Sequence, residues 1–346
     1  MVRPLGPLAT IAILVLACGT STPTPSATSA AGSPSAASVL PSAPAPGFSS
    51  GSAIGGGPVP IESLGAVRID VAGEPDWLAL AGGNAWAAVV GGVRKIDAAT
   101  GKVDGLVPVD DTICLAMDVG FGSLWVGGCK QHRLYRIVPS SGLPFTPPID
   151  LPIPAIREES SIAAGEGGVW IVSTDHRLVR VDSVTNRADP DTWPLPEGAA
   201  AARAGLGSIW VTVSPTDTLL RVSPADPKTS QAIKVGKRPR FLAVGDDAVW
   251  VMNQGDGSVT RVDRAGAVVA TIQVSDVPIQ GGDIAVGGGA VWVRTEQDLV
   301  VRIDPTTNAV TARYGPPSGS GSVAADDDAL WVSAHDTASV WRLPLR

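Results

Sequence analysis

Few side chains in this chain could support acid–base chemistry, and they are scattered. The 346 residues include three histidines, His132, His176 and His335, and no histidine lies between Arg177 and Ala334. General acid–base catalysis needs one group that accepts a proton and one that gives it. No Ser-His-Asp order, glycine-rich phosphate loop or paired-carboxylate motif accompanies these histidines. We therefore expect three solvated loop histidines, no catalytic residues, no metal and no cofactor.

Other charged side chains lie where apolar strands are expected to begin, and they could form a ligand-binding face. With the three histidines and Glu296, the candidates are Asp76, Trp77, Asp111, Glu158, Glu159, Arg203, Arg238, Arg240 and Asp283. Mixed charges and an aromatic ring are typical of surfaces that hold small polar ligands or protein loops. The run 326–328, three aspartates, is expected at a solvated turn, with calcium binding as the alternative.

The N-terminal segment, residues 1–17, has the pattern of an export signal. Arg3 supplies a positive charge, and an apolar stretch from Leu8 to Ala17 follows it. A stretch of ten residues is too short to cross a bilayer as a helix, which needs about 20. The alternative is a buried core helix, but nothing amphipathic follows.

Cys18 comes directly after Val15-Leu16-Ala17, which resembles the bacterial lipobox. A thiol is the nucleophile that is alkylated at the membrane surface, and small residues before it admit the signal peptidase. We expect Cys18 to carry lipid, which would place the protein outside the cytoplasm and anchor it to the bacterial cell membrane. The alternative is an ordinary signal peptide with an incidental cysteine.

Residues 18–60 are expected to be a disordered tether between the lipid and a folded domain. The stretch from Gly19 to Pro60 carries no charged residue and is nearly all Ser, Thr, Pro, Ala and Gly. Such a segment cannot bury enough apolar area to offset the entropy of ordering it. The whole chain has a net charge of −7, so we expect no nucleic-acid partner.

Residues 61–346 contain one repeat, seen seven times, that centres on a tryptophan between apolar residues. The tryptophans are Trp86, Trp125, Trp170, Trp210, Trp250, Trp292 and Trp331, at steps of 39, 45, 40, 40, 42 and 39 residues. A period near 40 residues with alternating strands and Gly/Asp turns is typical of a four-stranded propeller blade. The sequence predicts an all-β, seven-bladed β-propeller with four antiparallel strands per blade, and we expect a monomer.

A basic residue follows each of these tryptophans by nine to eleven positions. The set is Lys95, Arg136, Arg180, Arg221, Arg261, Arg302 and Arg342. Counting strands A to D outward from the axis, the tryptophan lies on strand B and the basic residue on strand C, so they should be cross-strand neighbours. A guanidinium can then stack on the indole. We expect a structural role for these arginines.

The last repeat stops after its strand C, and the segment Gly65 to Val71 has the pattern of a strand D. We expect this N-terminal strand to complete the C-terminal blade and to close the ring, which leaves no open sheet edge.

The repeats contain two motifs, Gly-Gly-Ala-Val-Trp-Val and Arg-Ile-Asp-Pro-Thr-Thr-Asn. They resemble those of YVTN/NHL-type seven-bladed propellers, the group that includes the streptogramin B lyases, and the resemblance covers about residues 62–346. It implies the fold more than the function, since propellers host unrelated activities. In those lyases histidines and a glutamate act with magnesium, whereas blades 4 to 6 here contain no histidine and only one glutamate, Glu296.

Cys114 and Cys129 are expected to form a disulfide, as paired thiols of exported proteins do. Strands at about 112–119 and 124–130 form a hairpin in which the two residues would face each other, at cross-strand Cβ distances of about 4.5–5.5 Å. The alternative is two buried free thiols, and a metal site lacks further ligands.

Two functions fit these features. The first is a non-catalytic binding or scaffolding propeller that takes an envelope protein or a small polar ligand. The second is an enzyme of the lyase or quinoprotein kind that acts outside the cytoplasm. A cluster of titratable groups at the channel mouth would discriminate between them, and the sequence alone favours the binding module.

Overall fold

The structure is a computed structural model, and it describes residues 57–109 and 113–346. The expected export signal (1–17), the lipidation site Cys18, the tether up to residue 56 and the candidate Asp111 lie outside the described residues. Within the described part of the chain, no helix is long and apolar enough to cross a membrane.

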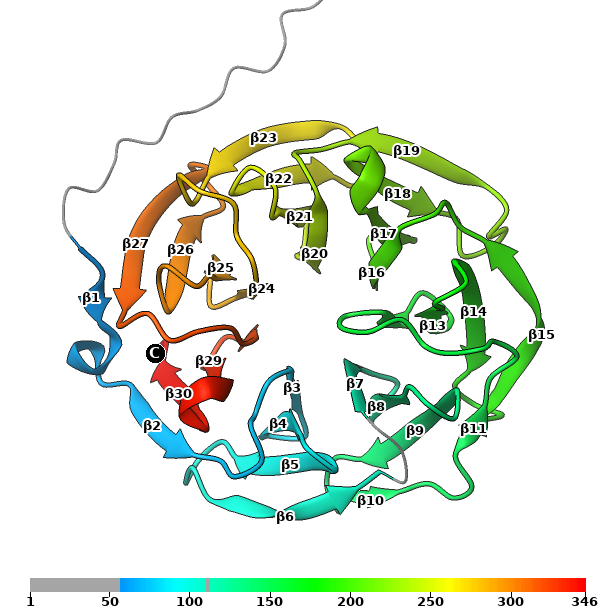
Figure 1. Cartoon of the computed structure of the whole chain (residues 1–346), viewed down its shortest axis with the longest axis horizontal. Helices are drawn as coiled ribbons and strands as arrows, with labels where there is room; N and C mark the ends of the chain where they lie inside the picture. The colour runs from blue at the N-terminus through cyan, green and yellow to red at the C-terminus, as the bar shows by residue number, and fades with distance from the viewer. Residues whose placement is uncertain (1–56, 110–112) are drawn as a thin grey trace, which may run out of the picture. The chain divides into compact units, whose positions relative to one another are not determined.

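Seven antiparallel sheets stand around a central axis, as the sequence predicts (Figure 1). Blade 1 comprises β3 (Leu78–Ala81), β4 (Asn84–Val89), β5 (Gly92–Asp97) and β6 (Val103–Pro108). Blade 2 comprises β7 (Ile113–Gly120), β8 (Ser123–Gly128), β9 (Arg133–Val138), β10 (Leu143–Pro144) and β11 (Ile149–Asp150). Blade 3 comprises β12 (Ile162–Gly165), β13 (Gly168–Val172), β14 (Arg177–Asp182) and β15 (Arg187–Pro194).

Blade 4 comprises β16 (Ala199–Gly205), β17 (Ser208–Val213), β18 (Thr218–Val222) and β19 (Ser230–Lys234), with the 3-10 turn η2 (Ser214–Thr216). Blade 5 comprises β20 (Pro239–Val244), β21 (Ala248–Asn253), β22 (Ser258–Asp263) and β23 (Val268–Gln273). Blade 6 comprises β24 (Asp283–Gly287), β25 (Ala290–Arg294), β26 (Val300–Asp304) and β27 (Ala309–Gly315). Blade 7 comprises β28 (Val323–Ala325), β29 (Ala329–Ala334) and β30 (Ser339–Pro344), with η3 (His335–Thr337).

The N-terminal segment closes the ring, and it does so in two places. β2 (Val67–Asp70) pairs antiparallel with β30 as the fourth strand of blade 7, which confirms the expected closure. Before it, β1 (Val59–Pro60) pairs parallel with β27 as a fifth strand of blade 6. The turn η1 (Ile61–Leu64) joins the two strands, and Ile61 is fully buried between the blades. One short segment therefore fastens two neighbouring sheets (Figure 1).

The seven repeat tryptophans occupy the core, where each side chain is 2% exposed or less. A polar indole N–H must find an acceptor when it is buried. In five blades it donates to the backbone carbonyl five residues earlier, at the turn between strands A and B: the acceptors are Ala81, Gly120, Gly165, Gly205 and Gly287, at 2.9–3.3 Å. The tryptophan thus fills the space between blades and also fixes the inner hairpin.

The predicted pairing of tryptophan and basic residue holds in every blade. In six blades the guanidinium lies 4.9–6.0 Å from the centroid of its cross-strand indole. Three of these arginines also reach the next blade. Arg136 donates to Ser183 O and Asn186 Oδ1, both at 2.7 Å, and Arg221 donates to Ala265 O at 3.5 Å. Arg261 likewise donates to a backbone carbonyl (2.6 Å) and to Asn308 Oδ1 (2.9 Å). The arginines are therefore structural.

Replacing Arg261 by Met should destabilise the fold by about 2–3 kcal/mol, because two charge-assisted hydrogen bonds to the next blade, a cation–π contact and a largely exposed ion pair with Asp247 are lost. The matched control is Arg302→Met, since Arg302 also stacks on its tryptophan but donates to Thr311 of its own blade. That control should cost about 1 kcal/mol. Urea unfolding monitored by tryptophan fluorescence measures both. Equal losses would show that the bonds between blades contribute nothing.

The expected disulfide is present between Cys114 and Cys129, whose Cα atoms are 5.3 Å apart. The register that led to it was wrong in detail. Met117 faces Val126, but Ile113 faces Gly128, so the pairing shifts between them at a β-bulge. Leu115 has a left-handed φ of 57° within that bulge. Cys114 therefore reaches its partner along a diagonal.

Candidate functional site

The central channel is closed near one end and open at the other. Each innermost strand runs from the face of the D–A and B–C loops toward the face of the A–B turns. Residues near the start of these strands, such as Leu78, Met117 and Leu242, are buried. Residues near their ends, such as Leu80 and Val244, are partly exposed. Solvent therefore enters from the A–B turn face.

The closure consists of two aromatic rings from distant blades. Trp77 precedes β3, and its ring lies 5.3 Å from the ring of Phe241 on β20. Trp77 is 2% exposed and Phe241 3%. The sequence predicts Trp77 on a ligand-binding face, but the structure buries its indole beneath that face. The reason is that the large side chains of Trp77 and Phe241, from blades 1 and 5, contact each other within the channel.

Charged side chains from four blades meet above these rings. Arg240 binds Glu159 through an ion pair of 2.6 Å, and its guanidinium lies 4.9 Å from the Phe241 ring. His335 Nδ1 lies 3.8 Å from Asp76 Oδ2. Burial raises the pKa of Asp76, Glu159 raises it further, and His335 opposes the shift. We call Asp76, Glu159, Arg240 and His335 the mouth cluster.

A buried arginine supports the mouth cluster from below. Arg294 is 0% exposed, and it donates to backbone carbonyls of Thr295, Asp298, Ser318 and Ser333. Burial lowers its pKa to about 10, while the charges of Asp336, Asp76 and Glu296 oppose that shift. Glu296 thus lies near the mouth, in the loop between β25 and β26.

The remaining candidates are not members of the mouth cluster, although Glu158 and Arg238 are next to Glu159 and near Arg240 in the sequence. His132 is exposed, and its Nδ1 lies 3.2 Å from Pro154 O. His176 is half-buried beside β14. All three histidines occupy B–C loops, as expected, but only His335 joins the mouth cluster. Glu158 is exposed, and its carbonyl accepts from Arg240 at 3.5 Å. Arg238 is exposed in a turn with a left-handed φ of 52°.

A second group of charges lies inside the channel. Arg203 and Asp283 line it, as does Asp118, which is not among the candidates predicted from the sequence. Burial raises the pKa of Asp283 to about 6 and raises that of Asp118, and Arg203 opposes both shifts. A signal for Asp118 was present in the repeat. Five of the seven positions opposite the repeat tryptophans are alanine, and the other two are Asp118 and Arg203.

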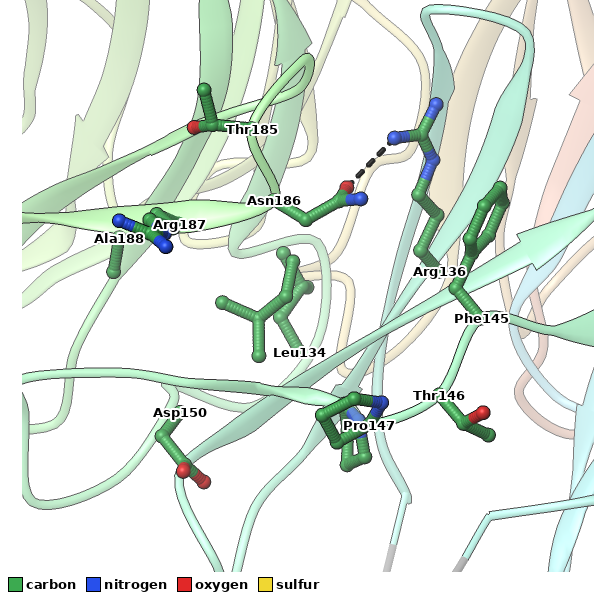
Figure 2. Close-up of a pocket in the computed structure, with 12 residues that line it drawn as sticks. Leu134, Arg136, Phe145, Thr146, Pro147, Asp150, Thr185, Asn186, Arg187 and Ala188 are labelled. Carbon is green, nitrogen blue, oxygen red and sulfur yellow. Dashed lines mark hydrogen bonds between the residues drawn. The ribbon is translucent and has the colours of Figure 1, made fainter.

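A separate pocket of about 600 Å³ lies at the rim, between the outer strands of blades 2 and 3. It exists because the outer strand of blade 2 is split into β10 and β11, and residues 145–148 bulge between them. Figure 2 shows Arg136 reaching Asn186 across this gap, with Phe145 beside it. Leu134 and Ile149 give it an apolar floor.

Within the described residues, no group of three or more His, Cys, Asp or Glu side chains is arranged to hold a metal ion. The run 326–328 lies at the turn before β29, where Asp327 and Asp328 pair with Arg346 at 3.2 and 3.4 Å.

Comparisons with solved structures identify the same fold. A streptogramin B lyase superposes with a TM-score of 0.68 at 14% identity, over 80% of this chain and 96% of that one. The virginiamycin B lyase of Staphylococcus aureus gives 0.66 at 16% identity, over 81% and 99%. The WD40 repeats of RRP9 give 0.67 at 12% identity, over 81% and 97%. No family model and no curated protein matches the sequence. The chain is thus a seven-bladed propeller of a fold shared by lyases and WD40 proteins.

Proposed function

We propose that this protein is an extracytoplasmic, lipid-anchored binding module that holds a partner at the mouth cluster. The observation that carries the proposal is the ion pair between Arg240 and Glu159, residues that are 81 positions apart and belong to the entries of blades 5 and 3. Such a bridge fixes charged groups before a ligand arrives, and preorganisation reduces the cost of binding.

The composition of the mouth favours recognition of a polar surface. Arg240 is 18% exposed and its partner Glu159 is 37% exposed, so both keep an open side. His335 and Asp76 offer a second polar pair from blades 7 and 1. The partner is an envelope protein loop or a small polar ligand. The sequence at 1–17 and Cys18 supports the location outside the cytoplasm.

Reversing charge at the mouth should release the partner. Arg238→Glu with Arg240→Glu should reduce capture of cross-linked envelope proteins by the full-length protein at least tenfold, because two positive charges are lost from the entry of blade 5 and residue 240 then repels Glu159. Asp327→Lys with Asp328→Lys on the opposite face is the matched control and should leave capture unchanged. Equal capture by both variants would contradict the proposal.

A charge swap separates direct contact from positioning. Glu159→Arg combined with Arg240→Glu keeps an ion pair at the same place but exchanges its signs. If the mouth contacts the partner directly, the swap stays defective, whereas restored capture would make the pair a positioning element only.

The alternative is a lyase-type enzyme, which the shared fold keeps in view. Incubating the full-length protein with a streptogramin B and magnesium, and following opening of the ring, tests it. We expect no turnover, because blades 4 to 6 offer no histidine as acid or base. Efficient turnover would refute a purely binding role.

A further inference from the structure

The channel below the aromatic closure is a cavity of its own. It has a volume of about 320 Å³, and all seven innermost strands contribute to its wall. Trp77 and Phe241 separate it from the mouth cluster, so it opens on the opposite face. Its size is at the lower end of the range of small-molecule sites, which is about 300–1,000 Å³.

The deep end of this cavity holds a carboxylate with one oxygen unused. Asp283 is 3% exposed. Its Oδ2 accepts from Ser322 Oγ at 2.7 Å and from the backbone N–H of Val323 at 3.3 Å. Its Oδ1 is buried and has no hydrogen-bond partner among the described residues. A buried acceptor without a donor is costly. Asp283 lines the channel, so a cation inside the cavity lies beside this incompletely paired carboxylate.

The side chains that line the cavity carry more negative than positive charge. The titratable side chains that line the cavity, taken over all seven innermost strands, are Asp118, Arg203 and Asp283. Asp118 accepts from the N–H of Ala164 at 2.7 Å. Arg203 directs Nη1 at backbone carbonyls, of which Ala202 O is nearest at 2.9 Å. Two carboxylates thus face one guanidinium, and an ionised wall has one negative charge in excess.

The rest of the wall is apolar, which indicates what kind of cation fits. Apart from the three charged residues, every lining side chain is Ala, Val, Leu, Ile or Met. Calcium takes six to eight oxygen ligands, and this wall cannot supply them from side chains. An organic cation needs one or two acceptors for its head and an apolar surface for its body.

We propose that the channel binds a small organic monocation, with a protonated amine held by the carboxylate of Asp283 and a short apolar body against the alanine and valine side chains. The ligand enters from the A–B turn face. The site goes beyond the mouth cluster, because the aromatic closure separates the two and neither requires the other.

Propylammonium chloride is the probe, and propanol is its uncharged counterpart of nearly equal size. Calorimetric titration of the full-length protein at pH 7.5 should give saturable binding of propylammonium, at about millimolar affinity or tighter, and none of propanol. Between pH 7 and pH 5 the affinity should fall about tenfold, since Asp283 takes up a proton near pH 6. Equal binding of the two probes, or binding of calcium alone, would overturn the proposal.

Two variants locate the site. Asp283→Asn removes the charge and should weaken propylammonium binding at least tenfold. Ala285→Leu keeps every charge but fills part of the cavity, and should have a similar effect. Asp327→Asn, an exposed carboxylate on the same face as the opening, should bind like the wild type. Unchanged affinity in both channel variants would place the amine elsewhere and refute the proposal.

Discussion

A chain that begins at residue 73 should lose nearly all of its stability relative to a chain that begins at residue 57. The shorter chain lacks β1, η1 and β2, so β30 becomes an open edge. It also lacks Ile61, Ile69 and Val71, which are 0%, 8% and 0% exposed. Burying three such side chains contributes about 5–9 kcal/mol. Domains of this kind have roughly 5–15 kcal/mol in total.

A graded truncation shows which strand matters. A chain that begins at residue 61 loses only β1, whose two residues are exposed, and should lose about 1 kcal/mol or less. Thermal unfolding of the three chains should therefore show one small step and one large step. Adding a synthetic peptide of residues 57–72 to the shortest chain should raise its melting temperature. If the chain from residue 73 melts like that from residue 57, the closure does not stabilise the ring.

The closure of the ring by the N-terminal strand was predictable from the repeat pattern. Seven tryptophans at near-constant spacing fix the number of blades, and a missing last strand at the C-terminus matches an extra strand at the N-terminus. The parallel addition of β1 to β27 was not predictable. Val59 and Pro60 are two exposed residues in a segment without alternating pattern, and only the proximity of β27 gives them a partner.

The site was harder to predict than the fold, because a ring brings together residues that are far apart in sequence. Arg240 and Glu159 were each selected as candidates, but nothing in their local sequence indicates the ion pair. Trp77 was selected for its type, and its burial depends on Phe241 in a distant blade. Asp118 was missed although its position could have been found. Aligning the seven repeats places it where most blades have alanine.

Replacing Asp283 by Asn should stabilise the protein at pH 7 by up to about 3 kcal/mol, because a neutral amide of similar shape takes the place of a buried carboxylate. Burial raises the pKa of this carboxyl from 3.8 to about 6, and that difference corresponds to about 3 kcal/mol. The folded protein therefore binds the proton more tightly than the unfolded chain. Ser322 and Val323 can still donate to the amide oxygen of Asn.

The sign of the pH dependence follows from the raised pKa. Below pH 3.8 the carboxyl is protonated in both the folded and the unfolded state, so its burial does not reduce the free energy of unfolding. As the pH rises from there through about 6, the unfolded chain ionises more readily than the folded protein, and the free energy of unfolding falls. Turn aspartates such as Asp97, Asp182 and Asp304 have lowered pKa values, because backbone and side-chain hydrogen bonds stabilise their charged form, and they act in the opposite direction. The difference between wild type and Asp283→Asn cancels their effect, so that difference is what should be measured.

Urea unfolding of both proteins from pH 4 to pH 8 gives this difference directly. It should be close to zero near pH 4, grow between pH 4 and pH 6, and stay constant above about pH 7. Asp327→Asn is the control, since its carboxylate is 76% exposed and its removal should change stability by less than about 0.5 kcal/mol at every pH. A variant that is less stable than the wild type at pH 7 would mean that Asp283 is held by donors stronger than Ser322 and Val323. A ligand bound in the channel of the wild type would also make the variant the less stable protein, so both proteins are first dialysed free of amines. Adding propylammonium should then stabilise the wild type and leave Asp283→Asn unchanged. The carboxylate that destabilises the empty channel would thereby be shown to bind the ligand.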